Sequence, residues 1–374
     1  MEKIKHLDRN MMENSIQAEE NLRFYNVADG GFFVSGLMAF DQERSYSRIP
    51  KEKRELLHKV NPCLIELGDH TAGGQISFRS DTKRVVIRAT LFTEPNMANM
   101  TPVGQCGFDC YVGTTKDDLT FFGITRFDSK TKEYQCEIIE PKIIHALQQK
   151  NASDVHEFVI NLPLYSNVVR LEIGIDSDAV IRPPSPYARK GQLVFYGTSI
   201  TQGGCASRPG MAYTNILSRR LNVEHLNFGF SGNGLGEYEV ANMLAQVSDP
   251  LMYVIDYEAN SGTNGRMIAS LEGFLKRIRQ VHPTTPILIL SRIPYVLDDY
   301  DAKTKELRTS LREFQREIVE KQKSADHNLY FMNGKDLFPE QYQEFTVDVI
   351  HPTDLGFYFM AENLIPVIKE ILQL

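Results

Sequence analysis

Cysteines, tryptophan and basic clusters are what this sequence has little of. Its 374 residues contain five cysteines and no tryptophan. An odd number of cysteines in a chain of this length is not a disulfide framework, and it is consistent with reduced thiols in a cytosolic protein. Cys106 and Cys110 have no second close pair of cysteines or histidines, which a structural zinc site needs. We therefore expect neither a disulfide-stapled fold nor a metal site.

Long charged runs and long apolar runs are missing as well. The 41 basic and 48 acidic residues give a net charge of −7, and no basic run is long enough to mark a nucleic-acid surface. No segment reaches the roughly 18–20 apolar residues of a membrane span, and the polar, acidic start does not resemble a signal peptide. If nothing was removed from the N-terminus, we expect a cytoplasmic protein that binds no nucleic acid and no membrane. The sequence does not indicate an oligomeric state.

The first half of the chain has the pattern of short β-strands. From about Asn21 to Asp176, apolar residues alternate with polar ones in short runs separated by turn residues. The clearest run is 169–176, and many strands at such spacing predict an antiparallel β-sandwich or jelly roll. The segment 176–190 contains three prolines within four positions and has no period. It therefore looks like a linker.

The second half alternates strands with helices. Apolar runs typical of strands lie at 193–196, 224–227, 251–255, 286–290 and 329–332, and helical patterns separate and follow them. Such alternation predicts an α/β fold, a flavodoxin-like parallel sheet with helices on both faces. We expect a β-sandwich domain over 1–185 and this three-layer domain over 186–374.

Three short blocks follow successive strands of the second half, at the edge where open parallel sheets carry their sites. Ser199 stands between the first strand and a helix, where free backbone N–H groups favour a developing anion. Gly232 lies in a glycine-rich loop, and an Asn260 amide could donate a hydrogen bond to a ligand oxygen. Each of these residues alone would be an ordinary turn or cap residue.

A fourth block lies just before the last helix. Asp348 and His351 are three residues apart, so a tight loop can bring the carboxylate to Nδ1 of the imidazole. Nε2 is then free to take a proton from a serine hydroxyl. An Asp-x-x-His string on its own is more often a helix cap, but Ser, Gly, Asn and Asp-x-x-His occur here in order after successive strands.

With these blocks, the chain from Gln192 to Leu374 resembles the SGNH/GDSL hydrolase superfamily, which is named for its Ser, Gly, Asn and His. The string that starts at Tyr196 and runs to Gly210 is similar to a bacterial subgroup with a β-sandwich before the hydrolase domain. The resemblance implies the following roles: Ser199 as the nucleophile, His351 as its base, Asp348 as the orienting acid, and the Ser199 N–H, Gly232 N–H and Asn260 amide as the oxyanion hole. The sequence departs from the family pattern in having Thr198 where Asp is usual, and in lacking the usual Gly-x-Asn-Asp around Asn260.

The resemblance implies an esterase that cleaves short acyl esters, often acetyl groups on carbohydrates, without a cofactor. Its partner would be a small-molecule or carbohydrate ester. An acyltransferase with the same triad and a non-catalytic carbohydrate-binding protein remain alternatives. A dinucleotide site at 232–236 is less consistent, because its glycines do not form G-x-G-x-x-G. Arg208 and Tyr213 either line the substrate pocket or tie down a loop and pack in a helix, and Cys205 is expected to pack.

Overall fold

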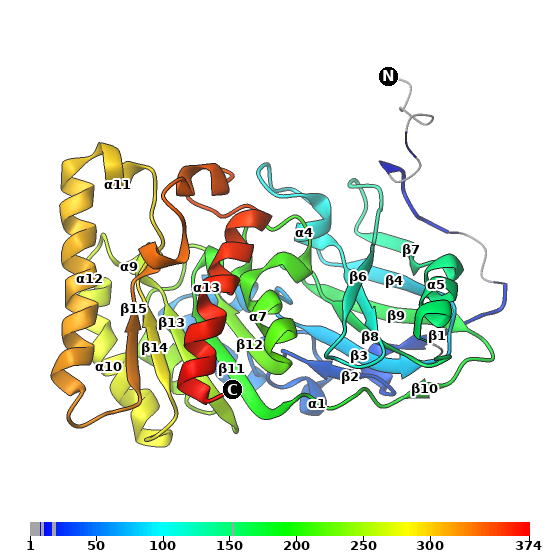
Figure 1. Ribbon diagram of the computed structural model, residues 1–374, viewed down its shortest axis with the longest axis horizontal. Helices are drawn as coiled ribbons and strands as arrows, with labels where there is room; N and C mark the ends of the chain where they lie inside the picture. The colour runs from blue at the N-terminus through cyan, green and yellow to red at the C-terminus, as the bar shows by residue number, and fades with distance from the viewer. Residues whose placement is uncertain (1–7, 9–10, 17–19, 152) are drawn as a thin grey trace.

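The computed structural model describes residue 8 and residues 11–16, 20–151 and 153–374. Two antiparallel sheets lie at the right of Figure 1, and a parallel sheet with its helices lies at the left. This arrangement confirms the predicted fold class. Among the described residues, no helix combines the length and the hydrophobicity that crossing a bilayer requires.

The antiparallel sheets pack face to face around one apolar core. Ile173 of the first sheet and Phe158 of the second belong to that core, and the Phe158 ring stacks on Phe78 at 5.0 Å. The first sheet has the order β1 (Leu22–Asn26), β9 (Val168–Asp176), β4 (Val85–Leu91), β7 (Glu133–Ile139). The second has the order β10 (Ile181–Arg182), β3 (Gln75–Ser80), β8 (His156–Asn161), β5 (Asp109–Gly113), β6 (Thr120–Ile124), with β2 (Phe33–Ser35) also on β3.

The parallel sheet is buried on both faces because helices cover each side. Its order is β12 (Val223–Gly229), β11 (Arg189–Gly197), β13 (Pro250–Asp256), β14 (Ile287–Leu290), β15 (Leu329–Met332). Successive side chains of β11 point to opposite faces: Phe195 packs with α7 (Tyr213–Leu221) and α13 (Asp354–Leu372), and Tyr196 with α8 (Tyr238–Leu244) and α10 (Arg266–Val281). The helix α12 (Ala302–Gln322) lies on the same face as α10.

Short helices make up most of the remaining regular structure. In the first half they are η2 (Val27–Asp29), α1 (Phe40–Glu43), α2 (Lys51–Val60), α3 (Cys63–Asp69), α4 (Pro102–Cys106) and α5 (Pro141–Asn151). In the second half they are α6 (Ser199–Gln202), η3 (Pro209–Met211), α9 (Glu258–Ser261), α11 (Leu297–Tyr300), η4 (Gly334–Leu337) and η5 (Tyr342–Phe345). The strand pattern of the first half did not predict its helices.

The segment 176–190, expected as a linker, is fixed at both ends. Ile181 and Arg182 form β10 against β3, and Arg189 already begins β11. Between them, the Ser185 N–H donates to Glu157 of β8 (2.8 Å). The prolines therefore end one strand and precede the next, and they do not make a free tether.

The two halves share apolar packing as well. Ile49, Leu57 and Leu64, from the first half, are buried in the same core as Tyr196 of β11. A chain that starts at Lys190 lacks these side chains and exposes the apolar surface they cover. The boundary between residues 185 and 186 stays a prediction, but the packing crosses it.

We therefore expect residues 190–374 expressed alone to lose cooperative thermal unfolding. Differential scanning calorimetry of this fragment and of the full chain measures the difference. A fragment that melts cooperatively at the same temperature as the full chain would show that the second half is independent.

A buried histidine in β12 makes stability depend on pH. His225 is 1% exposed, and its Nε2 lies 2.9 Å from Asn215 Oδ1. Burial lowers its pKa from 6.5 to about 3, so the folded chain keeps the imidazole neutral where the unfolded chain protonates it. The contribution of this group to the free energy of unfolding is complete above its unfolded pKa. It declines as the pH falls through the window between the two values.

We expect the free energy of unfolding to decrease as the pH is lowered through that window. His225 contributes at most about 1.4 kcal/mol per pH unit to this decrease. His225→Asn should make the decline shallower, whereas His58→Asn, which changes an exposed histidine, should leave it unchanged. Urea unfolding at about pH 7.5 and about pH 5.5 measures both slopes. Equal slopes in wild type and His225→Asn would contradict the assignment.

Candidate active site

Ser199, His351 and Asp348 form one hydrogen-bonded chain. Ser199 Oγ lies 2.8 Å from His351 Nε2, and His351 Nδ1 lies 2.8 Å from Asp348 Oδ2. Ser199 is 9% exposed, which keeps the hydroxyl close to solvent but mostly covered. The structure thus brings together the three residues that the sequence singled out, in the order that proton transfer from serine to imidazole requires.

A sharp turn from β11 into α6 presents Ser199. A Cβ atom on Gly197 would lie 2.0 Å from Thr201 Oγ1 and 2.5 Å from the Asp256 carbonyl oxygen, so only glycine fits there. Thr198 caps α6 by accepting a hydrogen bond from the Ile200 N–H (3.3 Å). Threonine in place of the usual aspartate thus provides an ordinary helix cap.

The loop that carries the acid and the base is held by its own hydrogen bonds. Asp348 Oδ1 accepts from the backbone N–H of His351 (2.8 Å), and the next residue, Val349, has a φ of +66°. A β-branched residue in this left-handed region is strained, typically by about 1–3 kcal/mol. The loop keeps this shape through the His351 N–H bond to Asp348 and a bond from the Val347 N–H to the His351 carbonyl oxygen (2.8 Å).

The first half of the chain contacts the carboxylate of Asp348 directly. Asn99, just before α4, donates from Nδ2 to Asp348 Oδ2 (2.7 Å). Partial burial raises the pKa of the Asp348 carboxyl, but hydrogen bonds from the His351 N–H and ring and from Asn99 outweigh burial and lower it below its usual value. Asp348 is therefore ionised at neutral pH and can stabilise a protonated imidazole.

Two of the predicted oxyanion donors, Gly232 and Asn260, follow the strands that flank β11. Gly232 follows β12 with a φ of +69°, and nothing lies within 4 Å of the position of a Cβ. Asn260 of α9 follows β13 and accepts from the Gly234 N–H on Oδ1 (3.1 Å), which orients its amide and leaves Nδ2 to donate. Among the described residues, no acceptor is recorded for the backbone N–H of Ser199 or Gly232.

A buried arginine from the first half supports the Gly232 loop. Arg48 is fully buried and donates from one nitrogen to the carbonyl oxygens of Asn227 and Gly229, each at 2.8 Å. Burial lowers the Arg48 pKa to about 9, so the guanidinium is still charged at neutral pH. Arg48 thus holds the end of β12 immediately before the loop that presents Gly232.

Arg208 and Tyr213 could either line the substrate pocket or serve as packing and anchoring residues. Their contacts are those of packing and anchoring residues. Arg208 donates to Asp109 Oδ2 and to the Tyr111 hydroxyl, each at 2.7 Å. Tyr213 has no exposed surface and stacks on Phe357. We therefore do not assign either residue to the substrate pocket.

Cys205 lies beside the acid and the base. Cys205, Asp348 and His351 each offer one atom of a kind that binds metals, and these three atoms lie within 4.8 Å of one another. Burial raises the Cys205 pKa to about 12, which keeps the thiol protonated, and the imidazole and carboxylate are already bonded to each other. A metal here would have to displace the hydrogen-bonded chain.

The residues that sequence reasoning missed are Asn99, Arg48 and Asp109, all in the first half. Asn99 gave no signal, because its partner is 249 residues away. Arg48 sits in a polar, irregular stretch where an arginine is unremarkable. Asp109 did carry a signal, since it is the charged residue of an otherwise apolar strand, and a buried carboxylate needs partners.

The chain matches two family models that follow one another along the sequence. Residues 22–181 match the N-terminus of SGNH hydrolase-type esterases, a family designated GxDLY. Residues 190–369 match the GDSL-like lipase/acylhydrolase family. No curated protein matches the chain.

Solved structures resemble almost the whole molecule. A protein described as a GDSL-like lipase from Bacteroides ovatus is 30% identical, with a TM-score of 0.82 over 94% of this chain and 98% of its own. A salicylyl-acyltransferase from a tetracycline biosynthetic pathway is 19% identical (TM-score 0.73, 92% and 96%), and a family two carbohydrate esterase from Cellvibrio japonicus is 12% identical (0.56, 94% and 98%). The chain belongs to the GDSL-like lipase/acylhydrolase family and is an esterase or acylhydrolase of the SGNH type with a β-rich N-terminal domain.

Proposed function

We propose that this enzyme is a serine esterase that removes short acyl groups, above all acetyl, from carbohydrate esters through an acyl-enzyme. One observation carries the proposal. Ser199 Oγ, the His351 ring and the Asp348 carboxylate are connected by two hydrogen bonds of 2.8 Å. This arrangement is the one that activates a serine for attack on an ester carbonyl.

In the acylation half of the proposed reaction, His351 Nε2 takes the proton of Ser199 as Oγ attacks the carbonyl carbon. The negative charge on the tetrahedral oxygen is stabilised by the Ser199 and Gly232 N–H groups and the Asn260 amide. The protonated imidazole, stabilised by Asp348, then gives its proton to the leaving alcohol. The acyl group remains on Ser199 Oγ.

In the deacylation half, His351 takes a proton from water, and the resulting nucleophile attacks the acyl carbon. The same donors hold the second tetrahedral oxygen. The bond to Ser199 breaks, the serine regains its proton from His351, and the carboxylic acid leaves. The cycle needs only the residues of the chain and water.

Likeness in fold supports the acetyl and carbohydrate parts of the proposal. Family two carbohydrate esterases from Cellvibrio japonicus and Clostridium thermocellum and an acetyl xylan esterase from Butyrivibrio proteoclasticus have TM-scores of 0.56, 0.55 and 0.51. A panel of p-nitrophenyl esters of rising chain length, beside acetylated sugars, tests both parts through the acid released. Preference for long acyl chains, or no release from any acetylated sugar, would contradict them.

Acyl transfer is the second candidate, because the salicylyl-acyltransferase shares the fold over most of both chains. A transferase would pass the acyl group from Ser199 to an acceptor alcohol, with His351 taking the alcohol proton in place of the water proton. Product analysis in the presence of added sugar alcohols separates the two. An excess of new ester over free acid would favour transfer.

Ser199→Ala should abolish turnover while the protein stays folded. Loss of such a nucleophile typically lowers kcat by about 10⁴–10⁶. A fluorophosphonate probe should label the wild type at Ser199, as located by peptide mass spectrometry, and should not label the variant. Labelling at another serine, or near-normal activity in the variant, would remove Ser199 from the mechanism.

Asn260→Ala should lower kcat by about 10²–10³ with little change in KM, because its amide acts mainly on the transition state. Asn264→Ala is the control: Asn264 lies four residues away, donates to the Asn260 carbonyl oxygen (3.3 Å) and accepts from the Arg266 N–H at the start of α10 (3.1 Å), so its loss should leave kcat nearly unchanged. Steady-state kinetics on an acetyl ester measures both variants. A rise in KM alone would place Asn260 in substrate binding.

A further inference from the structure

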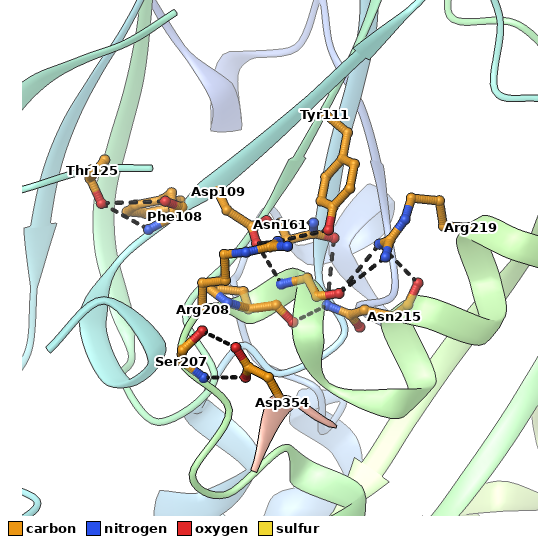
Figure 2. A network of polar contacts seen from close by, with 12 residues as sticks. Phe108, Asp109, Tyr111, Thr125, Asn161, Ser207, Arg208, Asn215, Arg219 and Asp354 are labelled. Atoms are coloured by element: carbon orange, nitrogen blue, oxygen red, sulfur yellow. Dashed lines mark hydrogen bonds and ion pairs between the residues drawn. The ribbon is translucent and has the colours of Figure 1, made fainter. Parts of the chain in front are cut away.

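Asp109 is a fully buried carboxylate of β5 whose function the proposed reaction does not explain. Its Oδ1 accepts from Asn161 Nδ2 (2.6 Å), within the same antiparallel sheet. Its Oδ2 accepts from Arg208 (2.7 Å) and from the Gly210 N–H (2.7 Å), both in the second half of the chain. Figure 2 shows the Asp109 carboxylate directed toward Asn161 and Arg208.

Two of the three partners of Asp109, Arg208 and Gly210, belong to the loop 203–210, which follows helix α6 and its proposed nucleophile. This loop could not keep its position with another residue at Gly210, because a Cβ there would lie 2.7 Å from Asp109 Oδ2. The Arg208 guanidinium lies 3.7 Å from the centre of the Phe121 ring of β6. One charged pair and one backbone hydrogen bond therefore attach the loop to the antiparallel sheet.

The same loop is bonded to Ser199 and lies next to the His351 ring. The Gly204 N–H donates to the Ser199 carbonyl oxygen (2.8 Å), and a Cβ on Gly204 would lie 3.3 Å from His351 Cδ2. Ser207 donates its N–H to Asp354 Oδ1 (2.8 Å) and its hydroxyl to Asp354 Oδ2. The lower part of Figure 2 shows these two hydrogen bonds between Ser207 and Asp354. Asp354 begins α13 only three residues after His351.

We infer that Asp109 is a positioning residue for the catalytic triad: through Arg208 and Gly210 it fixes the loop that sets Ser199 against His351. The inference rests on the proposed function for its kinetic consequence. It also gives a structural role to the stretch Gly107-Phe-Asp109-Cys-Tyr111, which has the letters of the GxDLY designation except for Cys110. Tyr111 shares the role, since its hydroxyl is a second acceptor for Arg208.

Asp109→Asn is the informative substitution because it keeps the shape and removes the charge. All three partners of Asp109 are donors, so an amide would place its own NH₂ against a donor. Glu157→Gln is the matched control. Glu157 is also fully buried in the second antiparallel sheet and paired with a cation, Lys116 (2.9 Å), but its backbone partner is Ser185 in the connecting segment.

We expect Asp109→Asn to lower kcat about 10²-fold with KM nearly unchanged, as small misplacements of reacting groups do. Fluorophosphonate labelling of Ser199 should slow by a similar factor. Glu157→Gln should lower the melting temperature by a similar amount but keep kcat. If the two variants lose kcat equally, or if Asp109→Asn keeps it, the positioning role is wrong.

Two further measurements keep the inference testable if Asp109→Asn folds poorly or if the wild type turns over no ester. Ser207→Ala removes only the hydroxyl bond to Asp354 and should lower kcat in the same direction, with KM unchanged. Hydrogen exchange of the amides in 203–210 and at the start of α13 should accelerate in the Asp109 variant and not in the Glu157 variant. Unchanged exchange would overturn the inference, whereas an inactive wild type with accelerated exchange in the variant would overturn only the proposed function.

Discussion

The arrangement of the two halves depends on two charged side chains that are buried where the halves meet. Burying a charge costs free energy, because the charge loses its hydration. Arg48 and Asp109 are both fully buried, and such groups are tolerated only when hydrogen bonds replace the lost water. Three of their seven hydrogen-bond partners are backbone atoms close to the site: the carbonyl oxygens of Asn227 and Gly229 at the end of β12, and the Gly210 N–H. The hydrogen bonds that compensate the buried charges therefore also hold the backbone next to the site in position.

This double role explains why the β-rich half is part of the enzyme and not an appended module. Asn99 contacts Asp348, Arg48 contacts the end of β12 just before the Gly232 loop, and Asp109 contacts the loop that follows Ser199 and α6. Each contact lies at the carboxyl edge of the parallel sheet, where side chains from separate strands must meet. The parallel-sheet half carries the proposed reacting groups, and the antiparallel half contributes many of the contacts that hold them in place.

The sequence was most informative where structure is local. Alternation of period two predicted β9, strand–helix alternation predicted the parallel sheet, and the spacing of Asp348 and His351 predicted their contact, because each pattern lies within a few residues. The helices α2 and α3 and the contacts of Asn99 were missed, since they are set by packing against residues far away in the chain. Arg208 illustrates the same limit: its position after Ser199 left pocket lining and loop attachment both open, and the partner that fixes its direction is a carboxylate 99 residues away.

The strained backbone at Val349 has a consequence for how this protein can change. Glycine at that position would adopt the left-handed conformation without a steric penalty, yet it would also let the acid–base loop visit other shapes. Valine instead restricts the loop to few backbone conformations, so that a change in the shape of the loop costs more free energy. Selection for heat resistance would therefore favour replacing Val349, because the replacement relieves backbone strain. The same replacement would loosen the loop that holds Asp348 and His351, so stability and activity would change in opposite directions.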